Sequence, residues 1–193
     1  LTTEQTDGGL ENDALGDVLS RIENVTGSKH DDSIIGDLIA NVLSGLAGVD
    51  TLAGGAGYDT LAGGEGADMA DYSESNVAVQ VDLNRTTAQT GGHAEGDVLV
   101  GIENVTGSAL KDTLTGKDYN STGLHGLAGD DILTGGNDSR STLYGGDGND
   151  SLYGGWYSDS LYGDEGNDFL QGDLDSYGQD NGGFFDGGGG VDT

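Results

Sequence analysis

The sequence predicts an all-β fold in which short parallel strands stack as a solenoid, and three observations lead to this prediction. Glycine-rich nonapeptides recur in tandem along most of the 193 residues. The chain has 39 glycines but no proline and no cysteine, which suits tight backbone turns and excludes a disulfide framework. Its 35 acidic residues against six basic ones give a formal net charge of −29. A chain this negative repels itself, so it needs bound cations in order to become compact.

The nonapeptide is clearest at Gly145–Tyr153, which has the sequence G-G-D-G-N-D-S-L-Y. Two further copies, Gly54–Ala62 and Gly63–Asp71, follow one another without a gap. The closely spaced glycines favour a turn, and the segment after the aspartate alternates polar and apolar residues as a short strand does. The copies predict two arrays, at residues 27–71 and 107–193.

Two nonapeptides form one coil, with a turn on each side and a short strand on each face. The apolar residue at position eight of each repeat points inward, because alternate side chains of a strand lie on the same face. We therefore expect a thin aliphatic core made of Ile34, Leu43, Leu52, Leu61, Leu114, Leu124, Leu133, Leu143, Leu152, Leu161 and Leu170.

The aspartate at position six can point into its own turn. Successive coils lie about 4.8 Å apart, so carbonyl oxygens of one turn lie beside the aspartate of the next, and together they form the all-oxygen site that Ca²⁺ prefers. The predicted aspartate ligands are Asp32, Asp50, Asp59, Asp68, Asp112, Asp131, Asp150, Asp159, Asp168 and Asp192. The predicted turn glycines of these sites are Gly45, Gly48, Gly55, Gly57, Gly64, Gly66, Gly126, Gly129, Gly146, Gly148, Gly163 and Gly166.

These repeats resemble the hemolysin-type calcium-binding nonapeptides of RTX (repeats-in-toxin) proteins, G-G-x-G-x-D-x-U-x, where U is a large apolar residue. The resemblance covers all but residues 72–105 and about the first twenty residues. It implies a right-handed parallel β-roll, or calcium-stapled β-solenoid, that holds several Ca²⁺ ions between its turns. It also implies type I secretion from a bacterium and folding outside the cell, with calcium affinities of the order of 10⁻⁴–10⁻³ M.

Successive turns alternate between the two sides of the roll. We place the copies that begin at Gly27, Gly45, Gly63 and Gly107, and every second copy after Gly107, on one side. There all position-six residues are aspartates, and we expect one nearly continuous calcium column from Asp32 to Asp192. The other side carries every insertion and has non-aspartate residues at position six, so calcium is expected there only at Asp59 and Asp159.

A longer repeat connects the two arrays, because Asp17–Ser28 returns as Asp97–Ser108. Residues 1–26 are predicted to be a partial lead-in module, and residues 72–106 a β-rich linker and lead-in that leaves the roll and rejoins it. Both ends of the chain are expected to be cut from a larger array. The alternating apolar residues that predict a half-buried strand in the linker are Val77, Val79, Val81 and Leu83.

Composition also narrows the range of functions. The negative charge disfavours nucleic acid and anionic membranes as partners, and no apolar run is long enough to span a bilayer. The N-terminus has no signal-peptide pattern. No G-x-S-x-G or H-E-x-x-H motif occurs, and His30, His93 and His125 are isolated. No catalytic residue is predicted.

The sequence favours a structural role, as a calcium-binding module of a large secreted or surface-attached bacterial protein that acts as an adhesin, matrix component or spacer. The alternative is the calcium-folding tail of an exported protease, lipase or polysaccharide-modifying enzyme. The expected partners are Ca²⁺ and neighbouring modules of the same chain, and homotypic assembly is a third option. Tyr144 and Tyr162 are predicted to stack on one face and Tyr153 to lie on the other, either as sheet packing or as a glycan contact.

Overall fold

The computed structural model describes residues 22–137, 140–172 and 182–193. Within these ranges the protein consists of short strands in parallel sheets and one 3-10 turn, η1 (Gly92–Ala94). None of the described residues belongs to a helix long and apolar enough to cross a membrane. The predicted all-β solenoid is confirmed. Residues 1–21 of the predicted lead-in module and residues 173–181 of the second array lie outside the described residues.

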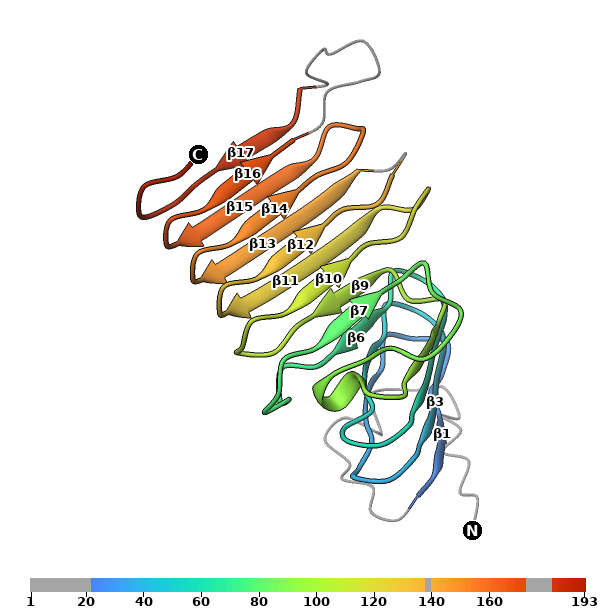
Figure 1. Ribbon diagram of the computed structural model, residues 1–193. Helices are drawn as coiled ribbons and strands as arrows, with labels where there is room; N and C mark the ends of the chain where they lie inside the picture. Colours follow the sequence, from blue (N-terminus) through green and yellow to red (C-terminus); the bar gives the residue numbers. More distant parts are fainter. Residues whose placement is uncertain (1–21, 138–139, 173–181) are drawn as a thin grey trace.

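The strands form three sheets, one of which runs the length of both arrays (Figure 1). We call this eight-stranded sheet the shared sheet. In spatial order it contains β2 (Ser33–Ile35), β4 (Thr51–Ala53), β6 (Met69–Asp71), β9 (Asn104–Thr106), β11 (Thr122–Ala128), β13 (Ser141–Asp147), β15 (Ser160–Glu165) and β17 (Phe184–Asp186).

Two shorter sheets contain the alternate strands of the coils. The first-array sheet has the order β1 (Asn24–Thr26), β3 (Val42–Ala47), β5 (Thr60–Glu65) and β8 (Val98–Val100). The second-array sheet has the order β7 (Gln80–Asp82), β10 (Thr113–Thr115), β12 (Ile132–Thr134), β14 (Ser151–Tyr153) and β16 (Phe169–Gln171).

The core is the predicted stack of position-eight residues. Equivalent residues pair in register from coil to coil, as Leu43 does with Leu61 and Leu143 with Leu161. All the predicted core residues are buried except Leu170, which is half-buried. Each nonapeptide coil thus contributes one apolar side chain from each face. Around the linker the core is broader, because it also includes the buried Tyr72, Ala94 and Ile102.

The linker between the arrays connects the three sheets. It supplies the first strand of the second-array sheet, β7, and the last strand of the first-array sheet, β8. The following strand, β9, joins the shared sheet between β6 and β11. Val79, Val81 and Leu83 are buried as predicted. Val77 is 53% exposed, so the buried alternation begins two residues later than predicted, at Val79.

Candidate metal centre

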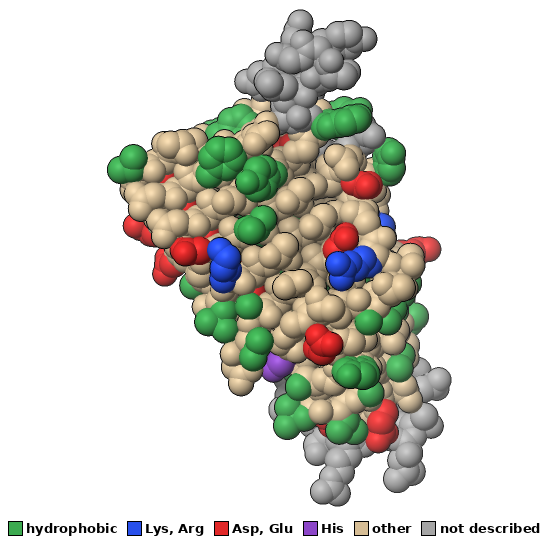
Figure 2. All heavy atoms as spheres, in the orientation of Figure 1, with side chains coloured by type: hydrophobic (Ala, Val, Ile, Leu, Met, Phe, Trp, Pro, Cys, Tyr) green, Lys and Arg blue, Asp and Glu red, His purple; other side chains and the backbone are tan. Residues whose placement is uncertain are grey.

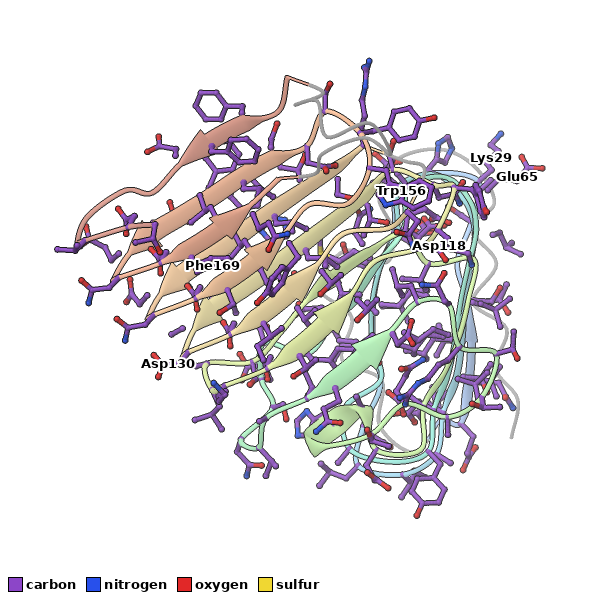
Figure 3. All side chains as sticks on the ribbon, turned by 45° about the horizontal axis from the view of Figure 1, so that its top comes forward. Lys29, Glu65, Asp118, Asp130, Trp156 and Phe169 are labelled. Atoms are coloured by element: carbon purple, nitrogen blue, oxygen red, sulfur yellow. The ribbon has the colours of Figure 1, made fainter. Side chains whose placement is uncertain are left out.

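The turns lie along two edges of the solenoid, which we name by the direction of the chain. At the entry edge the chain passes into the shared sheet, through residues 27–32, 45–50, 63–68, 101–103, 116–122, 135–141 and 154–159. At the exit edge it leaves that sheet, through residues 36–41, 54–59, 72–97, 107–112, 126–131, 145–150, 163–168 and 187–192. In Figure 3, Lys29, Glu65, Asp118 and Trp156 mark the entry edge and Asp130 marks the exit edge.

The predicted single column from Asp32 to Asp192 is wrong. The backbone N–H of Asp68 donates to Glu103 Oε2 at 3.1 Å, so the column of Asp32 and Asp50 continues into Glu103. The carboxylate of Asp112 instead accepts a hydrogen bond from the N–H of Val79 at 2.7 Å and begins a separate column. The first column lies at the entry edge, and the column from Asp112 to Asp192 lies at the exit edge.

The two columns differ because of the linker. Between the copies at Gly63 and Gly107 the chain passes from β6 through β7 to β8, and then from β8 to β9. The first connection is the long segment 72–97 and the second is only Gly101–Glu103, so neither resembles a nonapeptide. The copy at Gly63 therefore enters the shared sheet, whereas the copy at Gly107 leaves it. The longer copies 116–122 and 135–141 do share one edge, as predicted, and it is the entry edge.

Each position-six carboxylate links two coils through one of its oxygens. In Asp150, Oδ1 accepts the backbone N–H of Asp131 at 2.8 Å, and the backbone N–H of Asp150 donates to Asp168 Oδ1 at 2.8 Å. The same bond recurs along both edges. Its acceptors are Asp50, Asp59, Asp68, Asp112, Asp131, Asp159, Asp168 and Asp192.

The second oxygen of most of these carboxylates is bare. Among the described residues, six aspartates have a buried Oδ2 with no hydrogen-bond partner, and they are Asp50, Asp59, Asp68, Asp131, Asp150 and Asp168. These side chains are at most 2% exposed. A buried carboxylate oxygen without a donor is costly, and a divalent cation is the ligand that a row of such oxygens fits.

Backbone oxygens are close to the bare carboxylates. At Gly126, Gly145 and Gly163, an added Cβ atom would collide both with the Oδ2 of the aspartate in the same turn and with a glycine carbonyl oxygen of the next coil. The predicted Gly45 likewise lies against Asp50 Oδ2. The other predicted glycines have positive φ and lie against carbonyl groups of the preceding coil: Gly48, Gly55, Gly57, Gly64, Gly66, Gly129, Gly146, Gly148 and Gly166.

This arrangement differs from a site built from clustered side chains. Within the described residues, no group of three or more Asp, Glu or His side chains is close enough to hold a metal ion. Each of the turns that contain a bare aspartate supplies one buried position-six carboxylate, and at Asp131, Asp150 and Asp168 a backbone carbonyl oxygen of the next coil lies nearby. A bound Ca²⁺ ion would supply the positive charge that these oxygens lack.

The surface retains a large excess of negative charge. Figure 2 shows acidic side chains along the exit edge of the second array and few basic side chains on the same face. Arg85 Nε lies 3.6 Å from Asp82 Oδ2 and forms an ion pair between half-exposed groups, which contributes little to stability. With only six basic residues against 35 acidic ones, ion pairs cannot neutralise most of the acidic side chains.

Two position-six residues were missed by sequence reasoning. Asp97 continues the exit-edge column after Asp59, whose N–H donates to Asp97 Oδ1 at 2.8 Å. The buried Tyr72 hydroxyl donates to Asp97 Oδ2 at 3.1 Å, so protein donors satisfy both oxygens. Glu103 is the other missed residue. Each directly precedes a three-residue strand whose middle residue is apolar and buried, as the repeat aspartates do, and this pattern could have identified them.

The aromatic prediction is confirmed. On the shared sheet the rings of Tyr144 and Tyr162 stack with centroids 4.8 Å apart and planes at 8°, and His125 stacks on Tyr144 at 4.7 Å. Tyr153 packs against Phe169 on the second-array sheet. The stacked rings cover one another's faces, which supports sheet packing because a glycan would need an open ring face. Burial lowers the pKa of His125.

The pH dependence of the calcium-free chain follows from the buried carboxylates. Burial raises the pKa of Asp131 to about 7 and that of Asp150 to about 6. These pKa values in the folded chain exceed that of an aspartate in the unfolded chain. Protonation of the two carboxyls therefore stabilises the folded chain fully below about pH 4, and this stabilisation is lost as pH rises through about 6 to 7. In calcium-depleted buffer, circular dichroism should therefore show more β-structure at about pH 5 than at about pH 8. Equal or smaller β content at the acidic pH would contradict this.

The coils, the carboxylate ladders and the bare oxygens define a class, the calcium-binding β-rolls. A family model agrees: the RTX calcium-binding nonapeptide repeat matches four times, at residues 35–70, 106–141, 125–156 and 144–176. These matches span more than half of the chain, which belongs to this family. Its repeats bind several Ca²⁺ ions per array, and the chain is a calcium-binding structural module of the RTX type. No curated protein matches the chain.

Proposed function

We propose that this chain is a calcium-folded structural segment of a larger protein that bacteria secrete or attach to their surface, where it serves as a stiff spacer in adhesion or matrix formation. The observation that supports this proposal is the set of six bare, buried carboxylate oxygens along the two edges of a chain of net charge −29. Without cations these charges oppose the compact state. RTX repeats are typical of secreted bacterial proteins.

The proposed role depends on a difference in calcium between the two sides of the cell envelope. In a low-calcium cytosol the repulsion keeps the chain extended, which suits passage through an export channel. Outside the cell, millimolar calcium saturates sites with dissociation constants of the order of 10⁻⁴–10⁻³ M. Binding to the folded state alone then drives folding.

The shape of the solenoid supports the spacer role. Eight strands of the shared sheet at about 4.8 Å each give a rod whose length grows with every added coil. Each coil contacts mainly its neighbours, so the rod can be extended without changing its cross-section. Neighbouring modules of the same longer protein are the partners that this architecture suits best.

A calcium titration tests the proposal. At neutral pH the calcium-free chain should be unfolded, with a radius of gyration toward about 47 Å. Compaction and β-structure should appear with a midpoint of the order of 10⁻⁴–10⁻³ M Ca²⁺. Magnesium at the same concentration is the control, because it prefers octahedral sites and retains its water. Identical circular dichroism and small-angle scattering with and without calcium would refute the proposal.

A further inference from the structure

The turns of the solenoid exist in two conformations, which differ at position two of the repeat. In one, φ of the position-two residue is positive, and in the other its backbone N–H donates to the position-six side chain of the same turn. The first kind, which we call open turns, has positive φ at Leu46, Gly55, Gly64, Leu127, Gly146, Gly155, Asp164 and Gly188. The second kind, self-capped turns, comprises 27–32, 36–41, 107–112, 116–122 and 135–141.

Self-capped turns satisfy the carboxylate without a cation. In turn 107–112, the N–H of Ser108 donates to Asp112 Oδ2 at 2.5 Å and its hydroxyl donates to Oδ1 at 2.9 Å. The N–H of Leu110 donates to Ser108 Oγ at 3.1 Å. Ser28 forms the same contacts with Asp32 and His30. The Oδ2 of these two aspartates therefore already has a donor, unlike the six bare ones.

In the open turns of the six bare aspartates, Oδ2 accepts no such hydrogen bond. Several of the position-two residues belong to strands instead and pair with the neighbouring coil, as Leu46 does with Gly64 and Gly146 with Asp164. Positive φ is strained for residues other than glycine, and costs about 1–3 kcal/mol at each position. Leu46, Leu127 and Asp164 nevertheless adopt it, and all six bare carboxylates belong to open turns.

A side-chain ladder also links coils at self-capped turns, as one does at the open turns, where Asp130 Oδ1 accepts the N–H of Asn149 at 2.9 Å. In the second array, Asn84 Oδ1 accepts the N–H of Asp118 at 2.9 Å, and Asp118 Oδ1 accepts the N–H of Asn137 at 2.8 Å. This side-chain ladder runs through the turns in which Thr122 and Ser141 replace aspartate. It joins neighbouring coils by hydrogen bonds at positions where a carboxylate is missing.

We propose that the backbone of position two selects which turns bind calcium, so that Asp32 and Asp112 bind none although both occupy position six. The coils that contain turns 27–32 and 36–41, and turns 107–112 and 116–122, then bind no calcium at the start of each array. The self-capped turn 135–141 also binds none, and calcium binds only at open turns. This inference rests on the proposed function, because it assumes that the open turns bind calcium.

The test is to count bound Ca²⁺ at saturation by native mass spectrometry and calorimetry. Ser108→Gly with Leu110→Gly restores the G-G-x-G-x-D pattern at 107–112 and should add one ion to the wild-type number. Asp112→Asn should leave the number unchanged, whereas Asp150→Asn should lower it. No added ion in the double variant, or equal losses from the two asparagine variants, would overturn the inference.

Circular dichroism in saturating calcium checks the fold of each variant. If Asp112→Asn does not fold, the ion count of the double variant tests the inference. If the double variant does not fold, the comparison of Asp112→Asn with Asp150→Asn tests it. If neither Asp112→Asn nor the double variant folds, the inference is overturned, because the self-capped turn could then not be converted into an open one. A wild-type chain that binds no calcium would instead refute the proposed function itself.

Discussion

Asp150→Asn is expected to weaken folding in calcium and to strengthen it in calcium-free buffer. The amide retains the oxygen that accepts the N–H of Asp131 but removes the charge from the bare, buried Oδ2. Loss of one ion from the folded state removes about 1.4 kcal/mol when free calcium is tenfold above the dissociation constant. Without calcium, relief of one buried unpaired oxygen is worth about 1–3 kcal/mol, so the sign of the change reverses.

The measurement is a denaturant titration of both proteins with saturating calcium and with none. Asp147→Asn is the matched control, because it removes the same charge from the same coil at an exposed position-three side chain. We expect it to change stability by less than about 0.5 kcal/mol in calcium. Destabilisation by Asp150→Asn under both conditions would show that the carboxylate serves only the hydrogen-bond ladder.

Gly166→Ala should be among the most damaging single-methyl changes in the chain. Gly166 has φ of +148°, and an added Cβ would overlap the carbonyl oxygen of Gly148 in the preceding coil. Strain of this kind costs about 1–3 kcal/mol before the overlap is counted. Separation of the two coils would also disturb the neighbouring site of Asp168. We expect a higher calcium midpoint and a lower unfolding temperature.

Gly189→Ala is the matched control for this variant. Its added Cβ would meet mainly the carboxylate end of the Glu165 side chain, which can move aside, and its φ lies outside the strained region. In a calcium titration followed by circular dichroism, the midpoint of Gly189→Ala should be close to that of the wild type, and the midpoint of Gly166→Ala should be well above it. Equal midpoints for the two variants would show that the coils can separate at Gly166 without cost.

Local sequence determined much of this fold because every coil repeats the same short-range rule. Leu143 and Leu161 occupy position eight of their repeats, and the period alone places them inside the stack and in register. The spacing of Tyr144 and Tyr162 likewise predicted their stacking on one face. In such a solenoid the neighbours of a residue lie one coil away, so periodicity in the sequence becomes contact in space.

The linker could not be predicted in the same way. Val79, Tyr72 and Asp97 lie close to partners far along the chain, and no period connects them. The number of crossings between the sheets in this segment decides which edge each later turn occupies. A count based on intact nonapeptides omits the three-residue turn at Gly101–Glu103, and it therefore placed the aspartates of the second array on the wrong edge.

By itself, the sequence determined the all-β solenoid, its aliphatic stack and the position-six aspartates of the intact repeats, because these follow from a nine-residue period and from charge. Only the tertiary structure decided how the columns are divided, at Glu103 on one edge and at Val79 on the other. It also distinguished Asp112 from Asp150, two residues at the same repeat position. The difference arises from the direction of one backbone N–H, which the φ angle at position two sets.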